Sequence, residues 1–292
     1  MIYFCADDYG LNETASMHIR QCVEAGALNK VSVFPNFDPV DLNEIAQGKP
    51  IRLSLHLNLV EGKCLADPKQ IGLLADDRGI LKHTFCGLLL LNLFQRKAFE
   101  SQVCKEVKAQ VRYWKSILPQ GIAFCMDTHQ HASMIPGVFR AMLKALQEEN
   151  ITPAHIRIPV EPLLPFIKAP SLYLTYKPIN IVKQWLLNLL WLFNKNEAKK
   201  HNIPMSCFLG VLFSGEMDEK RLMKILPAYS RLAEKRGWDI EVLFHPGYLE
   251  KPDPGFGEKH VVFDSFYLSE NRRKEYDSVM KFQEEVSDYA VY

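Results

Sequence analysis

Residues 2–10, IYFCADDYG, are an apolar run that ends in two adjacent acids and a glycine. This order predicts a buried β-strand that delivers Asp7 and Asp8 into a turn at its carboxyl end. Later apolar runs in the chain also end in His or Asp. The sequence therefore predicts several strands whose polar ends surround a site.

Strand and helix patterns alternate along the rest of the chain. Further strands are predicted over residues 30–35, 51–59, 122–126, 155–158, 206–213 and 240–244. Helices are predicted over residues 12–25, 40–47, 98–117, 138–149, 219–236 and 271–286, with an interruption at Pro227. Alternating strands and helices imply a parallel sheet. We therefore predict an α/β fold, a TIM-like (β/α) barrel that is seven-stranded and distorted.

The strand over residues 51–59, IRLSLHLNL, alternates without a break. Its odd positions are Ile or Leu, and its even positions are Arg52, Ser54, His56 and Asn58. Successive side chains of a strand point to opposite faces, so one face is apolar and the other polar. This pattern suits a barrel strand that is covered by helices outside and lines a site inside.

Composition and charge limit the classes of protein to consider. The 292 residues are 48% hydrophobic and 24% charged, enough for one barrel-sized domain. No repeat or linker marks a boundary. We expect one catalytic domain over residues 1–292, with apolar insertions near residues 85–94 and 179–193. The net charge of +1 gives no electrostatic case for nucleic acid or an anionic membrane as the main partner.

The cysteines indicate whether the protein occupies a reducing or an oxidising compartment. Seven are scattered along the chain, with no C-x-x-C pair. Such a set argues for reduced thiols and against a disulfide framework or a thiolate zinc site. No basic segment followed by an apolar one precedes the first strand, so we expect no signal peptide. Both features predict a cytoplasmic protein.

Side chains that can bind a metal follow four of the predicted strands: Asp7, Asp8, His56, Asp127, His129, His131 and His245. The carboxyl ends of barrel strands meet at one face, so these residues are expected to converge. One carboxylate and two imidazoles form a facial set of ligands for a divalent ion, with positions left for water and substrate. A second carboxylate could take a proton from the water, and a histidine opposite could protonate the leaving group.

Simpler interpretations stay open for these residues. The acid pair could cap the turn, and His56 could be an ordinary hydrogen-bonded histidine. His245, before Pro-Gly, could only shape a loop. His129 and His131 point to the same side if the chain stays extended, so either could be a ligand. Asp127 is better suited to orient an imidazole than to bind the ion.

Five motifs, in order, carry a resemblance that covers residues 2–249. They are ADDYG (6–10), SLHLNLVEG (54–62), MDTHQHASMIP (126–136), RIPVEP (157–162) and LFHPGY (243–248). Together they resemble the YdjC-like carbohydrate deacetylases. The resemblance implies a TIM-like barrel that uses a divalent metal to hydrolyse N-acetyl groups on amino sugars such as chito-oligosaccharides.

The resemblance also assigns roles, position by position. It makes Asp8, His56 and His129 the ligands of one divalent ion, Mg or Zn. Asp7 becomes the catalytic base and His245 the general acid. Metal-bound water would attack the acetyl carbonyl, and the amine would leave after protonation.

Other family positions are less defined. Arg157 matches a position that braces the base or holds substrate, and His131 and Asp127 are supporting residues. Gln130 stands where a run of histidines is common, which could alter substrate preference.

The implied function is therefore a metal-dependent deacetylase of an N-acetylated sugar, either an oligosaccharide or a glycolipid. The same ligands would also serve a hydrolase of another amide or of a phosphoester. A sugar-binding protein with a vestigial site is the alternative outside enzymes.

Two apolar segments, residues 85–94 and 179–193, are unusual for this fold. Both follow strands and so are expected on the same face as the proposed site. The second spans 15 residues and contains Lys183, whereas a transmembrane helix needs ~20 predominantly apolar residues. The two segments could form a lid or an interface between subunits of a homo-oligomer. The other interpretation is peripheral contact with a membrane or a lipid-bearing sugar.

Overall fold

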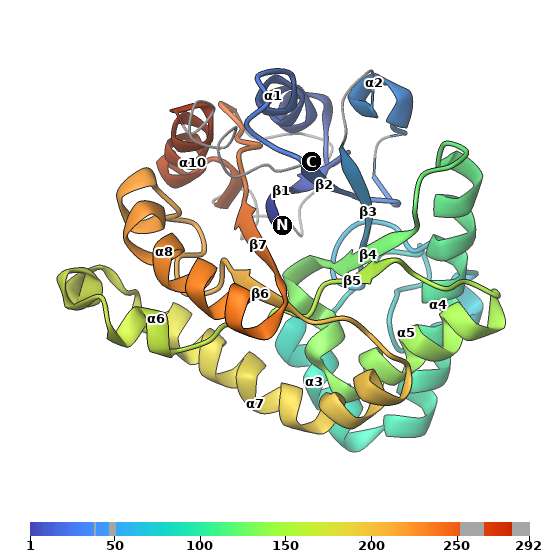
Figure 1. Ribbon diagram of the computed structural model, residues 1–292. Helices are drawn as coiled ribbons and strands as arrows, with labels where there is room; N and C mark the ends of the chain where they lie inside the picture. The colour runs from blue at the N-terminus through green and yellow to red at the C-terminus, as the bar shows by residue number, and fades with distance from the viewer. Residues whose placement is uncertain (38, 47–50, 252–265, 282–292) are drawn as a thin grey trace. The chain divides into compact units, whose positions relative to one another are not determined.

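The computed structural model describes residues 1–37, 39–46, 51–251 and 266–281 (Figure 1). Contacts between Cα atoms divide the chain into two compact units. The first unit comprises Met1–Val31, Ile158–Asn188 and Met205–Tyr292, and the second comprises Ser32–Arg157 and Leu189–Pro204. The single domain predicted over residues 1–292 stays a prediction.

Seven strands form one sheet in the order β5-β4-β3-β2-β1-β7-β6. They are β1 (Ile2–Tyr9), β2 (Lys30–Val33), β3 (Arg52–Leu57), β4 (Cys125–Thr128), β5 (His155–Ile156), β6 (Ser206–Leu209) and β7 (Asp239–Phe244). The pairings β1–β7, β6–β7, β3–β4 and β4–β5 are parallel. The predicted fold class, an α/β fold with seven strands of the distorted TIM-like type, is confirmed.

The first unit contains the β1–β7–β6 part of the sheet and the helices that follow these strands. They are α1 (Glu13–Glu24), α6 (Leu164–Ile167), the 3-10 turn η3 (Pro170–Thr175), α8 (Glu219–Arg236) and α10 (Glu270–Lys281). β1 pairs with β7 from Ile2–Ile240 to Ala6–Phe244, and β1 continues to Tyr9 beyond the end of β7. This register places Asp7 and His245, the residues after the last pair, at the same end.

Local signals in the sequence explain where these helices begin and end. The Asn12 side chain accepts a hydrogen bond from the Ala15 amide and caps α1, as predicted. Asp218 caps α8 in the same way, and Gly237 ends it in the left-handed conformation at φ 63°. The predicted interruption at Pro227 is wrong, because α8 is continuous and takes Pro227 into its interior.

The second unit contains the β3–β4–β5 part of the sheet. Its helices are α2 (Leu42–Ala46), the turn η1 (Pro68–Gln70), α3 (Phe85–Phe94), α4 (Arg96–Ile117), η2 (His129–Met134) and α5 (Pro136–Glu148). The predicted apolar stripe of α4 is fully buried, from Val103 and Val107 to Val111 and Trp114. Since the residues recur at helical spacing, one side of α4 covers the core of the second unit.

Both apolar segments form helices. Residues 85–94 match α3, and residues 179–193 lie within α7 (Pro178–Lys200), which begins in the first unit and ends in the second (Figure 1). In the described part of the chain, none of the helices has the length and apolar content that crossing a membrane requires. The last predicted helix is shorter in the structure, since α10 ends at Lys281 and residues 282–286 lie outside the described residues.

Candidate active site

A buried carboxylate orients the first predicted metal-binding histidine. His56 on β3 and Asp127 on β4 are partners in the parallel register, and His56 Nδ1 lies 2.6 Å from Asp127 Oδ1. The other oxygen of Asp127 accepts hydrogen bonds from Ser32 Oγ at 2.7 Å and Ser54 Oγ at 2.6 Å. Asp127 therefore fixes the His56 ring and leaves Nε2 pointing away from the carboxylate.

His129 has the matching arrangement. Its Nε2 lies 2.6 Å from Glu61 Oε1, and its Nδ1 lies 3.2 Å from Nε2 of His56. The ring of Phe34 packs edge-on against both imidazoles, with centroids 4.9 and 5.0 Å away. Each histidine thus turns one nitrogen to a buried carboxylate and the other toward the same point. This is the arrangement of imidazoles that bind a metal and are oriented by outer carboxylates.

Glu61 was not predicted as a site residue. It is fully buried, and its Oε2 has no hydrogen-bond partner among the described residues. The loop after β3 holds it rigidly: Asn58 Oδ1 accepts the Glu61 amide, and the side chains of Asn36 and Asn58 donate to the Glu61 carbonyl at 2.9 Å. The residue stands in the SLHLNLVEG motif, but spacing alone did not separate it from the other polar residues there.

His129 and His131 would share a side only in an extended chain, and this segment is not extended. The chain leaves the extended conformation after Thr128, and Gln130 and His131 adopt left-handed angles with φ of 51° and 57°. Strand alternation therefore does not apply to this segment. The described contacts bring His129, and not His131, to His56.

Arg157 follows β5 and lies in the Asp127 network. Its Nη2 is 3.3 Å from Ser32 Oγ and 3.6 Å from Asp127 Oδ2, and the side chain is buried. The guanidinium therefore belongs to the buried polar network that holds the carboxylate orienting His56.

The acids of the first unit end β1. Asp7 and Asp8 are both buried, and Asp8 has a left-handed backbone with φ of 73°, which is uncommon for a residue with a Cβ. Asp8 Oδ2 accepts a hydrogen bond from Arg272 Nη2 at 2.9 Å. The Arg272 guanidinium lies 4.2 Å from the ring centroid of Phe266, so it is fixed by packing as well as by charge.

α10 also holds the predicted general acid. The backbone amide of His245 donates to Glu275 Oε2 at 2.7 Å, and its Nδ1 lies 3.6 Å from the same oxygen. Glu275 Oε1 accepts the Met217 amide at 3.2 Å. Arg272 and Glu275 lie one turn apart, so a single face of α10 reaches both strand ends. The sequence predicted only a helix over residues 271–286 here, and no spacing connects residue 272 with residue 8.

Acids and histidines of the described chain form groups that could hold a metal ion. Their members are buried: Asp7, Asp8, His56, Asp127 and His129. Carboxylate and imidazole donors suit Zn²⁺, Mn²⁺ or Mg²⁺, and the donor types alone do not choose among these ions.

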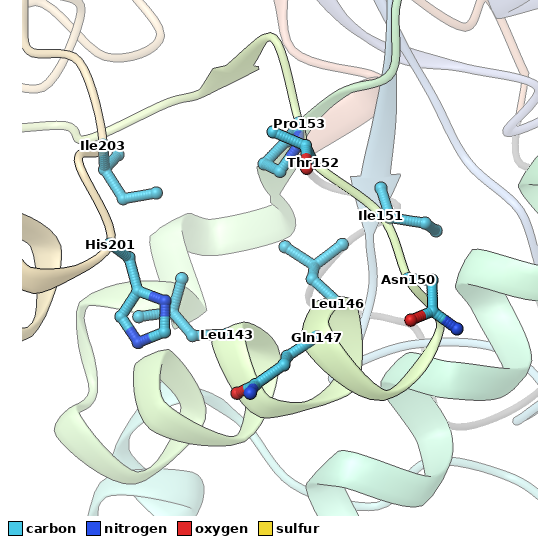
Figure 2. A pocket seen from close by; sticks show the side chains of 9 residues that line it. All are labelled: Leu143, Leu146, Gln147, Asn150, Ile151, Thr152, Pro153, His201 and Ile203. Atoms are coloured by element: carbon cyan, nitrogen blue, oxygen red, sulfur yellow. The ribbon is translucent and has the colours of Figure 1, made fainter.

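A separate pocket of about 410 Å³ lies in the second unit (Figure 2). Its lining comes from the end of α5, the segment before β5 and the segment after α7: Leu143, Leu146, Gln147, Asn150, Ile151, Thr152, Pro153, His201 and Ile203. Residues 150–153 precede β5, whereas His129 follows β4. The pocket is therefore at the amino ends of these strands and is not the candidate active site.

The fold and these side chains define the class of protein to which the chain belongs. This is an α/β protein with a parallel sheet whose strands end in buried acids and histidines that suit a divalent ion. The family described as YdjC-like protein matches residues 1–284, so the chain belongs to the YdjC-like family.

Three relatives named carbohydrate deacetylase share about a quarter of their residues with this chain. The zebrafish (Danio rerio) protein is 25% identical, covering 85% of this chain and 82% of its own. The Clostridium beijerinckii protein is 25% identical, covering 78% of this chain and 87% of its own. The Xenopus laevis protein is 26% identical, covering 85% of this chain and 82% of its own.

One solved structure supports the fold. It is an Enterococcus faecalis protein named for a suggested role in cellobiose-phosphate cleavage. It superposes with a TM-score of 0.61 at 14% identity, covering 98% of this chain and 94% of its own.

Proposed function

We propose that this protein is a metal-dependent hydrolase that removes the acetyl group from N-acetylated amino sugars. Family membership and the names of the relatives support a carbohydrate substrate. The observation that carries the proposal is the pair of imidazoles, each backed by a buried carboxylate, whose other nitrogens lie 3.2 Å apart. Such a pair is suited to share one divalent ion.

Asp8, His56 and His129 would hold the ion, either Mg or Zn, and all three belong to one candidate group of ligands. When bound, the ion would supply polarisation of the acetyl carbonyl and a lowered pKa for the attacking water. Arg272 Nη2 pairs with Asp8 Oδ2 at 2.9 Å and would orient the carboxylate for this role.

Asp7 is the proposed general base, and His245 the proposed general acid. Asp7 takes a proton as the water oxygen forms a bond to the acetyl carbon. His245 donates a proton to the sugar nitrogen as the C–N bond breaks, which releases acetate and the free amine. Glu275 Oε2 lies 3.6 Å from His245 Nδ1 and accepts the His245 backbone amide, so it would position the imidazole for this step.

Acetate release from N-acetylglucosamine oligomers, after metal removal and after addition of Zn²⁺, Mn²⁺ or Mg²⁺, tests the proposal. Release that depends on the added metal is expected. Metal-loaded protein that cleaves a phosphoester or another amide, and releases no acetate from the oligomers, would favour the other hydrolase. Oligomer binding without turnover would favour a sugar-binding protein.

We also propose a reducing, cytoplasm-like compartment for this reaction. The seven cysteines are scattered along the sequence with no C-x-x-C pair, and most are buried. Cell fractionation with an antibody to the chain tests this, and recovery from an oxidising compartment would contradict it.

A further inference from the structure

Helix α7 exposes large apolar side chains along one side. Six of them are between 54% and 64% exposed: Ile179, Val182, Trp185, Leu189, Leu192 and Phe193. Their spacing of mostly three or four residues places them on one face of the helix, which we call the apolar face. Monomeric proteins rarely expose a contiguous surface of this kind without a function for it.

The opposite side of α7 is polar and faces the protein. Asn180 Nδ2 donates to two backbone carbonyls at 3.1 and 3.2 Å, and Gln184 Nε2 donates to Glu161 Oε2 at 3.1 Å. Asn194 Nδ2 donates to the Met134 carbonyl at 2.8 Å. The buried amides, together with the buried side chains of Leu187 and Leu190, anchor this side of the helix, while the apolar face stays exposed. Turning the apolar face inward would break these hydrogen bonds.

Each unit adds further exposed apolar side chains from nearby sequence. In the first unit these are Leu164, Ile167 and Leu174, and in the second they are Leu90, Leu93 and Phe94 of α3. The exposed apolar residues thus lie in the two insertions and in the segment that precedes α7.

Along the sequence, both insertions carry cations and no acid, although Lys177 is paired with Glu216 at 2.9 Å. Residues 162–196 contain Lys168, Lys177, Lys183 and Lys195 and no acid. Residues 79–99, around α3, likewise contain three cations and no acid. The chain as a whole carries only +1, so its acids lie elsewhere. Trp, Leu and Phe beside lysines are the composition of helices that lie in the interface of an anionic membrane.

We propose that the apolar face of α7 docks onto the surface of an anionic lipid bilayer. The helix has 23 residues and lies parallel to the membrane plane, with its apolar face among the acyl chains and its lysines at the phosphates. A second copy of the chain fits less well, because a symmetric contact would bring the lysines of both copies together. This inference goes beyond the proposed function and does not depend on catalysis.

Co-sedimentation of the full chain with vesicles tests the proposal. Vesicles of phosphatidylcholine alone are compared with vesicles of equal parts phosphatidylcholine and phosphatidylglycerol. Binding to the mixed vesicles that falls as salt is raised is expected. Wild-type protein that stays in the supernatant, or that binds both vesicles equally, would overturn the proposal.

Variants locate the contact. Trp185→Ser and Phe193→Ser should each lower partitioning about tenfold, because each removes an aromatic side chain from the acyl region. Met223→Ser, at an exposed residue of α8, is the matched control and should leave binding unchanged. Thermal melting checks that all three variants fold. A wild-type dimer that Trp185→Ser converts to a monomer would show instead that a second copy covers this face.

Discussion

The two groups of catalytic candidates are held in different ways. In the second unit, His56 and His129 are oriented by the carboxylates of Asp127 and Glu61, which come from a neighbouring strand and from the loop after β3. In the first unit, the residues at the ends of β1 and β7 are held by a helix more than two hundred residues away from β1 in sequence. β4 and the loop after β3 thus orient the histidines, whereas Asp8 and the backbone of His245 are held by α10.

The difference has a physical basis. A neutral imidazole needs only one hydrogen-bond partner to fix its ring and tautomer. A buried carboxylate needs a cation or several donors, and Asp8 obtains the cation from Arg272. Removing the partner should therefore lower stability in the first group and metal affinity in the second.

The largest effect is expected from Asp7→Asn. If Asp7 is the general base, kcat for acetate release should fall by about 10² to 10⁴, because the amide cannot accept the proton. Metal content should stay at the wild-type level, since Asp7 is not the proposed ligand. Steady-state kinetics and elemental analysis measure the two quantities. Asp77→Asn, at an exposed loop residue, is the matched control, and a wild-type rate for Asp7→Asn would refute the assignment.

Arg272→Met tests the dependence of the first unit on α10. It leaves the Asp8 carboxylate buried without its cation, which should cost about 3–5 kcal/mol in the free energy of unfolding. Urea denaturation measures the loss. Arg273→Met, at an exposed residue on the same helix, is the control. Equal stabilities for the two variants would show that Asp8 does not need Arg272.

Glu61→Gln tests the second group, where a smaller effect is expected. The amide can still contact His129 but no longer fixes its tautomer by charge, so metal affinity should fall about 10- to 100-fold. Calorimetric titration of the apoprotein with Zn²⁺ measures the affinity. Glu234→Gln on the exposed side of α8 is the control.

This variant also separates a role through the metal from a purely structural one. Excess metal should restore turnover in Glu61→Gln, and thermal stability should stay close to the wild-type value. An unchanged Zn²⁺ affinity would contradict the role of Glu61.

The sequence predicted the strand ends well and their partners poorly. Alternation over residues 51–59 and the acids after residues 2–6 depend on local periodicity, and the structure places His56 and Asp8 at those strand ends. Glu61, Arg272 and Glu275 were missed because their partners are set by tertiary contacts, for which local spacing carries no signal.

The backbone conformation of the segment after β4 could not be predicted for a related reason. The sequence left either His129 or His131 as a ligand if the chain stayed extended, but Gln130 and His131 adopt left-handed angles. Glycine is the usual sequence marker of that conformation, and neither residue is a glycine. The 15-residue apolar segment was recognised, but its orientation was not, because only the contacts of Asn180 and Asn194 reveal which side of α7 faces the protein.

The smallest expected effect is a change of stability with pH that comes from Glu161, a buried acid whose hydrogen-bond donors in the described structure are neutral. Glu161 accepts hydrogen bonds from the amides of Gly210, Val211 and Leu212, yet its burial outweighs them and raises its pKa from 4.5 to about 7. The folded chain therefore binds this proton more tightly than the unfolded chain. Its contribution to stability is greatest below about pH 4.5 and is lost as pH rises to about 7. Between about pH 6 and about pH 8 the free energy of unfolding should fall by roughly 1 kcal/mol, and Glu161→Gln should remove this slope in urea titrations. If the free energy of unfolding falls equally with pH in Glu161→Gln and in the wild type, Glu161 is already ionised in the folded protein over this pH range. Its neutral hydrogen-bond donors would then hold the carboxylate as firmly as Arg272 holds Asp8.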